Sequence, residues 1–442
     1  MNAHRGQLVS LARPVYLSLL ASVASGIINT VWVSRLGGAA VAAVAVATNA
    51  ENVLLGVALV FASGTTVLVA HARGARDPAA VRAAVRGGWA LCALVTPVVA
   101  AGGWLLREPL AALVLGGGEG AAPRLAAAYF AISLPGMAVF FVQQLVDGIL
   151  KGAGDTRTPM RLALLANGLI LVCDPVLIHL YGVRGAAAST VLCRGAALAV
   201  GLRALRRTPL LRTAARAPLA AGPLPAALRR TLATGLPMSA DFTVRQAGAL
   251  VLVAIVARLG VTAVAAYAIA YKVMYVATMA FYAVRQAAAI HTAHTRGAGQ
   301  DARRDIGRQA VLLAGALGLL AAVLFAATAP WITAAFGAGP EVARQGVLFL
   351  RCIGPYLLLM ACFIALGGVF EGSGSAPALL RVTLLGTAVQ LPLAYALSGL
   401  GLPGVCLALA LAMAVQCAAV AVLLPRRSGR QEETGVSSAR VA

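Results

Sequence analysis

Long apolar runs, separated by short polar segments rich in glycine and arginine, dominate this 442-residue chain. The runs repeatedly reach the ~20 residues that an α-helix needs to cross the hydrocarbon core of a bilayer. Strands of an outer-membrane barrel would instead alternate apolar and polar residues over ~10 positions. The pattern therefore predicts an all-α polytopic membrane protein with twelve transmembrane helices. The expected helices are 14–34, 40–68, 87–106, 124–147, 162–181, 186–203, 233–257, 262–290, 309–333, 345–369, 382–399 and 403–424.

The sequence contains an internal repeat. An offset of 223 residues pairs Pro14 with Pro237 (237 − 14) and aligns RLGGAAVAAVAVA with RLGVTAVAAYAIA without a gap. An offset of 220 (355 − 135) pairs Pro135 with Pro355, two prolines that permit helix kinks. Because six is even, two six-helix halves share one orientation in the membrane, as in parallel transporter repeats. The predicted units are an N-terminal lobe at 1–203, a cytoplasmic linker at 204–230, a C-terminal lobe at 231–425 and a cytoplasmic tail at 426–442.

Composition and charge agree with membrane insertion. The chain is 60% hydrophobic and 11% charged, against about 45–50% and about 25% in soluble domains. The net charge of +22 comes from arginines clustered after the even-numbered helices, a distribution that indicates topology and not nucleic-acid binding. We expect a multi-pass protein of the inner (cytoplasmic) membrane with both termini cytoplasmic and its first span retained, not cleaved as a signal peptide. A solvated connector is favoured over an interfacial helix for the linker.

The sequence motifs disfavour an enzyme. The seven cysteines are scattered in apolar surroundings, without CxxC or a histidine at ligand spacing, and are interpreted as apolar fillers. HExxH, Walker and DxD sequences are absent and the loops are short, which disfavours an integral-membrane enzyme. No cofactor or metal is expected, and the partners expected are a small-molecule substrate and membrane lipids, with a monomer favoured.

Four motifs in order carry a family resemblance: RLG after the first helix of each half, HARGA after the second, GILKGAGDTRTPM after the fourth and CDP on the fifth. Over residues 8–425 the chain resembles the multidrug and toxic compound extrusion (MATE) transporters. The resemblance implies export of cationic or amphipathic compounds in exchange for Na⁺ or H⁺, by rocking two lobes about a central cavity. The glycine-rich KGAGDT turn is interpreted as a mechanical joint in which Asp155 caps the next helix.

Acids inside apolar runs are costly in a bilayer, so each is a functional candidate. They are Glu51, Asp147, Asp174 and Asp241. The resemblance implies an ion-coupling site made by the first, fifth and sixth helices. There Asn29 stands where relatives have an aspartate, Ile170 takes the place of an asparagine with Asn167 one turn back, and Asp174 and Thr190 match. With one titratable acid left, coupling to H⁺ is favoured over Na⁺.

The C-terminal half departs further from the family pattern. Arg245 stands where some relatives have a glutamate, and Asp241, four residues earlier, is expected to pair with it on one helix face. Arg194, Asp241, Arg245 and Lys272 are candidates for the cavity, whereas Arg285 and Arg351 are expected to snorkel from helix ends. If Arg194 and Arg245 line the cavity, they would disfavour a cationic cargo and favour an anionic or zwitterionic one.

The function predicted is secondary active efflux of small organic compounds by ion antiport through alternating access. A second hypothesis keeps the architecture and makes the protein a flippase of lipid-linked sugars or another amphiphile of the same superfamily. Twelve helices and the KGAGDT and CDP motifs favour the first hypothesis.

Overall fold

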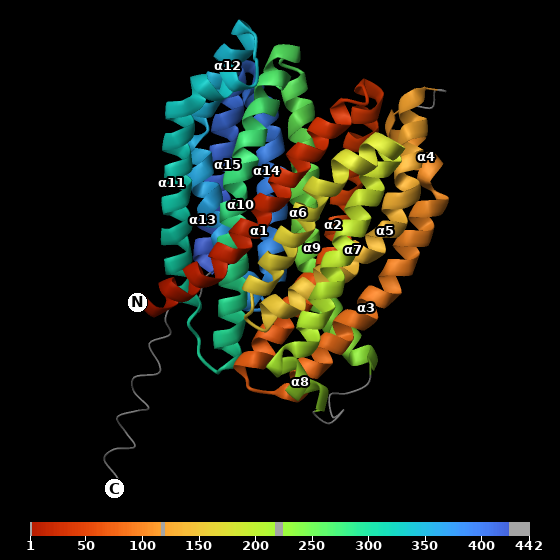
Figure 1. Cartoon of the computed structure of the whole chain (residues 1–442). Helices are drawn as coiled ribbons and strands as arrows, with labels where there is room; N and C mark the ends of the chain where they lie inside the picture. Colours follow the sequence, from red (N-terminus) through yellow and green to blue (C-terminus); the bar gives the residue numbers. More distant parts are fainter. Residues whose placement is uncertain (1, 116–119, 217–223, 424–442) are drawn as a thin grey trace, which may run out of the picture.

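The computed structural model describes residues 2–115, 120–216 and 224–423. Within these ranges the chain forms fifteen α-helices and one short 3₁₀ turn, and no strand (Figure 1). Twelve helices are long and apolar enough to cross a membrane, which confirms the predicted fold class. These are α1(Asn2–Ser34), α2(Gly38–Gly74), α3(Pro78–Leu105), α5(Ala121–Gly152), α6(Arg157–Tyr181), α7(Val183–Arg207), α9(Leu224–Ala257), α10(Val261–Gly297), α11(Arg303–Ala335), α13(Gly354–Gly372), α14(Ala376–Leu397) and α15(Leu402–Leu423).

Matching turns join the helices of the two halves. Gly37, between α1 and α2, has φ 98°, and Gly260, between α9 and α10, has φ 101°, a backbone conformation that only glycine adopts readily. Gly154 and Gly374 form a second matched pair, with φ 87° and 77°. Asp155 accepts hydrogen bonds from the backbone of the first turn of α6, as the KGAGDT motif predicts.

The helix predicted at 345–369 is wrong as a single element. The structure divides this region into α12(Pro340–Cys352) and α13, with Ile353 between them. Pro355 lacks an N–H group, and Gly354 before it has low helix propensity, so the pair favours a break. Its counterpart Pro135 lies inside the continuous helix α5, so the break belongs to the C-terminal half alone.

The linker also contains structure that the sequence did not predict. Residues of α8(Pro209–Arg216) pack against α3, where Leu210, Leu211 and Ala214 share a buried cluster with Val81 and Ala84. This segment is therefore a helix docked on the bundle, not the solvated connector expected. A further short helix, α4(Arg107–Leu115), follows α3. Residues 217–223 and the predicted tail at 426–442 lie outside the described residues.

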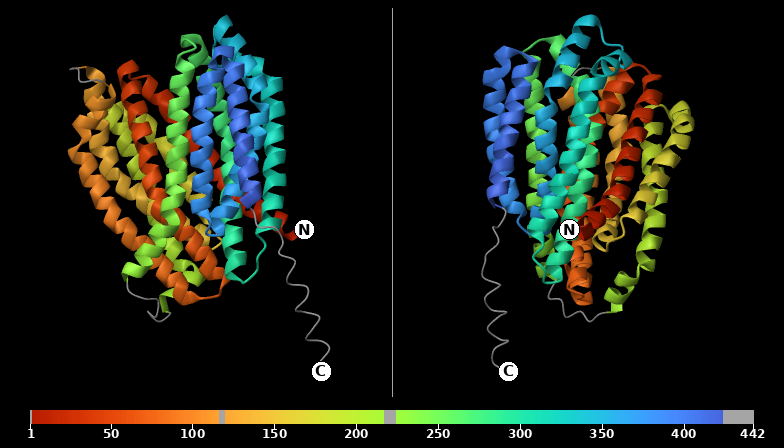
Figure 2. Two further views of the ribbon diagram at one scale, coloured as in Figure 1. Left: turned by 180° about the vertical axis from the view of Figure 1, so that it is seen from behind. Right: turned by 90° about the vertical axis from the view of Figure 1, so that its left-hand side faces the viewer.

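Helices of the N-terminal and C-terminal halves form two groups that lie side by side (Figures 1 and 2). Helix α1 runs obliquely from one group to the other (Figure 1). Leu8 and Val15, near its start, belong to the same buried cluster as Ile290 of α10, whereas its second half packs against α6. Helix α9 is the counterpart, because Thr231 packs against α3 and Gly248 against α14.

Glycines allow the two halves to approach closely at the end of the bundle that carries most of the arginines. A side chain on Gly74 of α2 would collide with the carbonyl oxygen of His294, and one on Gly297 of α10 would collide with that of His71. Farther along α2, about 21 Å from Gly74, Gly235 of α9 lies equally close to the backbone of Val60. The halves therefore pack tightly at this end, here called the Arg-rich end.

The opposite end of the N-terminal half has a core of its own. Val33, Ala43 and Phe130 belong to a buried cluster that contains residues of the N-terminal half only. Shared packing between the halves is thus concentrated toward the Arg-rich end.

Candidate functional site

Asp174 and Asn29 meet where α6 packs against α1. The amide Nδ2 of Asn29 donates a hydrogen bond of 2.7 Å to Oδ2 of Asp174. Asp174 is fully buried, and its other oxygen, Oδ1, has no hydrogen-bond partner in the structure. The structure therefore brings together two of the residues predicted for ion coupling, and leaves one carboxylate oxygen free to take a proton or another ligand.

Asn167 lies on the same interface but not in this pair. Its amide donates a hydrogen bond of 3.4 Å to the hydroxyl of Ser22 on α1. Ser22 precedes Asn29 by seven residues on α1 (29 − 22), and Asn167 precedes Asp174 by seven residues on α6 (174 − 167). Seven residues span ~10 Å along a helix. Asn167 thus supports the contact between α1 and α6 at a distance from Asp174.

Thr190 belongs to a separate cavity between α2, α5 and α7. Its hydroxyl donates to the carbonyl of Ala186 in its own helix. The cavity has a volume of about 10 Å³ and is here called the Glu51 cavity. Its polar lining consists of Glu51, Tyr129, Ser133, Thr190 and Arg194. The family resemblance implies that Thr190 lies with Asp174, and Arg194 is a candidate for the substrate cavity, whereas the structure brings Thr190 and Arg194 together.

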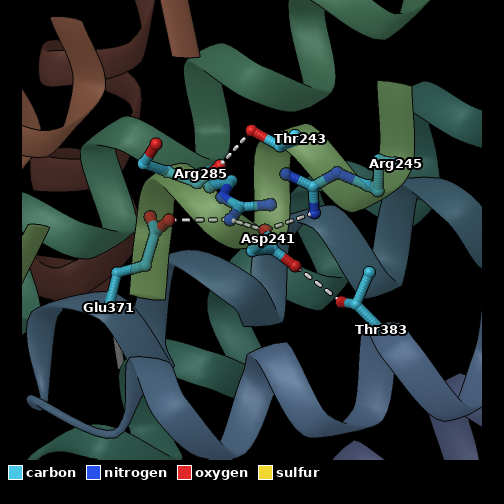
Figure 3. Close-up of polar contacts among 7 residues, drawn as sticks. Asp241, Thr243, Arg245, Arg285, Glu371 and Thr383 are labelled. Atoms are coloured by element: carbon cyan, nitrogen blue, oxygen red, sulfur yellow. Dashed lines mark hydrogen bonds and ion pairs between the residues drawn. The ribbon is translucent and has the colours of Figure 1, made fainter. Parts of the chain in front are cut away.

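A buried ionic network occupies the C-terminal half (Figure 3). Asp241 of α9 is the centre, with Oδ2 at 2.7 Å from Arg245 and 2.7 Å from Arg285. Thr383 of α14 donates a hydrogen bond of 2.6 Å to Oδ1 of the same carboxylate. The pairing of Asp241 with Arg245, predicted from their spacing of four residues, is confirmed.

Arg285 does not snorkel, and that expectation is wrong. Its side chain is 5% exposed and bridges two carboxylates, Asp241 and Glu371, at 2.7 Å each. A buried guanidinium is stable only when it is paired and hydrogen-bonded, and two acids from different helices supply that pairing here. Together, Asp241, Arg245, Arg285, Glu371 and Thr383 form what we call the Asp241 network.

Glu371 was missed by sequence reasoning, although a signal exists. At the offset of 220, Glu371 aligns with Lys151 (371 − 151), so the repeat reverses charge at this position. In the N-terminal half Lys151 donates a hydrogen bond of 3.1 Å to Gln286 of α10. A reversed charge inside a repeat indicates that the two halves use the position differently.

Lys272 and Arg351 belong neither to the Glu51 cavity nor to the Asp241 network. Lys272 is exposed on α10, next to the exposed Tyr271, and Arg351 is exposed in the last turn of α12. Lys272 is therefore not a partner of Asp241, and the structure does not join it to the other cavity candidates.

Charge balance separates the two halves. The Asp241 network contains two acids and two arginines, all in contact, so its charges offset each other. In the N-terminal half, Asp174 is bound by a neutral amide and has no cation within ion-pair distance in the described residues. An uncompensated buried carboxylate is costly, and a proton or cation reduces that cost. The N-terminal half therefore has the chemistry of a cation-binding or proton-binding site. No group of three or more potential metal ligands is found among the described residues.

Two matching helical groups, each with a polar centre inside the spans, define a multi-pass membrane transporter built from a repeat. The MatE family model matches residues 14–176 and again 237–396. The chain belongs to this family, the MATE multidrug efflux transporters.

Individual relatives agree with this assignment. The chain is 24% identical to "Probable multidrug resistance protein NorM" of Thermotoga maritima, over 88% of this chain and 85% of the relative. It is 29% identical to "Probable multidrug resistance protein YpnP" of Bacillus subtilis, a match that spans 44% of each chain.

Solved structures show the same fold. An outward-facing multidrug resistance MATE transporter of the MOP superfamily has a TM-score of 0.87, with 21% identity over 98% of this chain and 97% of that chain. A MOP superfamily transporter from Pyrococcus furiosus, described as having a binding pocket of reversed polarity, has a TM-score of 0.86 with 22% identity over 95% of each chain.

Proposed function

We propose that this transporter exports small organic compounds by exchange with protons, and that Asp174 is the acid that couples the two movements. The observation that supports the proposal is the buried Asp174 carboxylate, held by Asn29 on one oxygen and unpartnered on the other. A buried carboxyl without a counter-ion changes its charge at modest cost, which suits it to binding and releasing one proton per cycle.

Protons suit this site better than Na⁺. A bare alkali cation inside protein requires several oxygen ligands, because it must replace its hydration shell. Asn29 turns its NH₂ group toward Asp174, so the pair offers a donor where a cation site would offer an oxygen. Asn167, the other amide expected at the site, is engaged with Ser22. One free carboxylate oxygen is enough for a proton.

The packing of the halves suits alternating access. From the positive-inside rule we infer that the Arg-rich end faces the cytoplasm, together with the start of α1 and the end of α15. With that orientation, this conformation is closed toward the cytoplasm. Opening requires α2 and α10 to separate where Gly74 and Gly297 now lie against the other helix. The parallel repeat provides two similar rigid groups for such a movement.

A cationic or amphipathic cargo fits the charges better than a pyrophosphate-linked lipid. Two of the arginines that could attract pyrophosphate, Arg245 and Arg285, are paired with Asp241. In the N-terminal half the carboxylate of Asp174 has no ion-pair partner among the described residues, and it attracts cations. The flippase hypothesis is accordingly the weaker one.

Transport in everted membrane vesicles tests the proposal. A pH gradient should drive uptake of a cationic dye by the parent protein, and Asp174→Asn should abolish it at equal expression. Glu108→Gln is a matched control, because Glu108 is an exposed acid at the surface, paired with Arg107. Undiminished pH-driven uptake in Asp174→Asn would remove Asp174 from the coupling role.

A further inference from the structure

The Glu51 cavity contains a second ionisable pair in the N-terminal half. Glu51 comes from α2, Ser133 from α5 and Arg194 from α7. A cavity of about 10 Å³ has room for at most a single water molecule. Ser133 is 4% exposed, and its hydroxyl lines this cavity without a hydrogen-bond partner in the structure. A buried unpartnered hydroxyl beside a carboxylate and a guanidinium indicates a built polar site and not a packing defect.

We propose that Glu51 and Arg194 form a charge switch that sets the affinity for a cationic cargo. When Glu51 is ionised it offsets the charge of Arg194, and when Glu51 takes a proton Arg194 is left as an unbalanced cation that repels the cargo. The proposal rests on the proposed function and extends it, because it assigns cargo release to a site other than Asp174.

Arg194 supplies the fixed charge of this switch. Arginine guanidinium groups stay protonated throughout the physiological pH range. The guanidinium of Arg194 lies 4.9 Å from the ring centroid of Phe140, a cation–π distance that holds it in place beside the cavity. The variable charge in the pair is therefore that of Glu51.

The surroundings of Glu51 contain few other charges. From α5 it faces Tyr129 and Ser133, and from α7 it faces Thr190 and Arg194. The other helices packed against α2, including α3, α9 and α10, contribute no charged residue to the lining of this cavity in the described part of the chain. Its charge state thus depends chiefly on its own proton and on Arg194.

Glu51, Arg194 and Asp174 all lie in the N-terminal half of the bundle. With both acids ionised, these three charged groups carry one net negative charge. One proton makes them neutral and a second makes them net positive. Successive protonation therefore converts a region that attracts cations into one that repels them.

Binding of radiolabelled tetraphenylphosphonium to the purified protein tests the switch without transport. The parent protein should bind this cation tightly near pH 8 and at least about tenfold more weakly near pH 6. A tenfold change in affinity corresponds to ~1.4 kcal/mol of binding free energy. Glu51→Gln should bind weakly at both pH values. Arg194→Gln should bind at least as tightly as the parent at pH 8 and severalfold more tightly than the parent at pH 6, whereas Arg194→Lys should bind as the parent does at both.

Arg351→Gln is the matched control, because Arg351 is an exposed arginine outside the cavity. Parental affinity of Glu51→Gln at pH 8, or parental affinity of Arg194→Gln at pH 6, would overturn the switch. If Glu51→Gln does not fold, the affinity of Arg194→Gln at pH 6 decides. Asp174→Asn separates the two proposals. Its transport reports on coupling, and a Glu51-dependent change of binding with pH should persist in it.

Discussion

Lys151 of α5 donates a hydrogen bond of 3.1 Å to Gln286 of α10, and so connects the two halves beside Arg285 of the Asp241 network. Close packing of α2 against α10 lies on the same side of the bundle. A second polar contact at this end joins the rings of His4 on α1 and His291 on α10, 2.9 Å apart. The Arg-rich end is thus held by polar contacts between side chains and by the fit of glycines against backbone.

Closure at this end should depend on Gly297. In Gly297→Ala the new methyl group would collide with the carbonyl oxygen of His71, so α2 and α10 could not approach as they do now. We expect cationic dye export to fall about tenfold or more while the protein still inserts. Gly168→Ala is the matched control, because no atom lies near the position of its added methyl group. Equal export by both variants would contradict the role of the glycine contact.

Arg285 should be the costliest side chain to remove from the Asp241 network. Arg285→Met leaves Asp241 and Glu371 buried with too little compensation, and removing one partner of a buried ion pair costs about 3–5 kcal/mol. Thermal unfolding of the purified protein would measure the loss. Arg303→Met, which removes an exposed arginine paired with Asp301, should cost under about 1 kcal/mol. Equal stability of the two variants would show that the network is not structural.

Arg245 should have a smaller structural role than Arg285. Its side chain is 20% exposed, and Asp241 would keep Arg285 and Thr383 after its loss. Arg245→Ala is therefore expected to unfold only slightly earlier than the parent. Its export of a cationic dye should rise severalfold, because one positive charge of the Asp241 network is removed. Loss of export in a stably folded Arg245→Ala would instead show that the cargo needs this guanidinium.

Restoring an acid at residue 29 should change the response to Na⁺. Asn29→Asp places a second carboxylate against Asp174, and two adjacent like charges favour binding of a cation or a proton. Na⁺ at ten times its dissociation constant would then stabilise the fold by about 1.4 kcal/mol. The test compares thermal unfolding in NaCl and in choline chloride. A Na⁺-specific shift of the same size in the parent would favour Na⁺ coupling.

Features encoded locally could be predicted from the sequence. Apolar runs gave the twelve spans, and the spacing of four residues gave the pair of Asp241 and Arg245. Contacts made by folding could not be predicted in this way. Arg285 and Glu371 are 86 residues apart, and Arg285 alone resembles an arginine near a helix end.

The grouping of the candidate site residues likewise required the fold. Thr190 lies beside Glu51 and Arg194 because α2, α5 and α7 meet there, although the family resemblance implies a place beside Asp174. The break after α12 had a local signal in Gly354 and Pro355. The matching proline of the other half, Pro135, lies inside α5 and leaves that helix continuous.

Purified protein reconstituted into proteoliposomes tests the central claim most directly. Export of a cationic dye should follow an imposed pH gradient in the absence of Na⁺, and Asp174→Asn should show no response to that gradient while Glu108→Gln responds as the parent does. Transport by the parent that follows a Na⁺ gradient and ignores the pH gradient, or a full pH response in Asp174→Asn, would contradict proton coupling through Asp174.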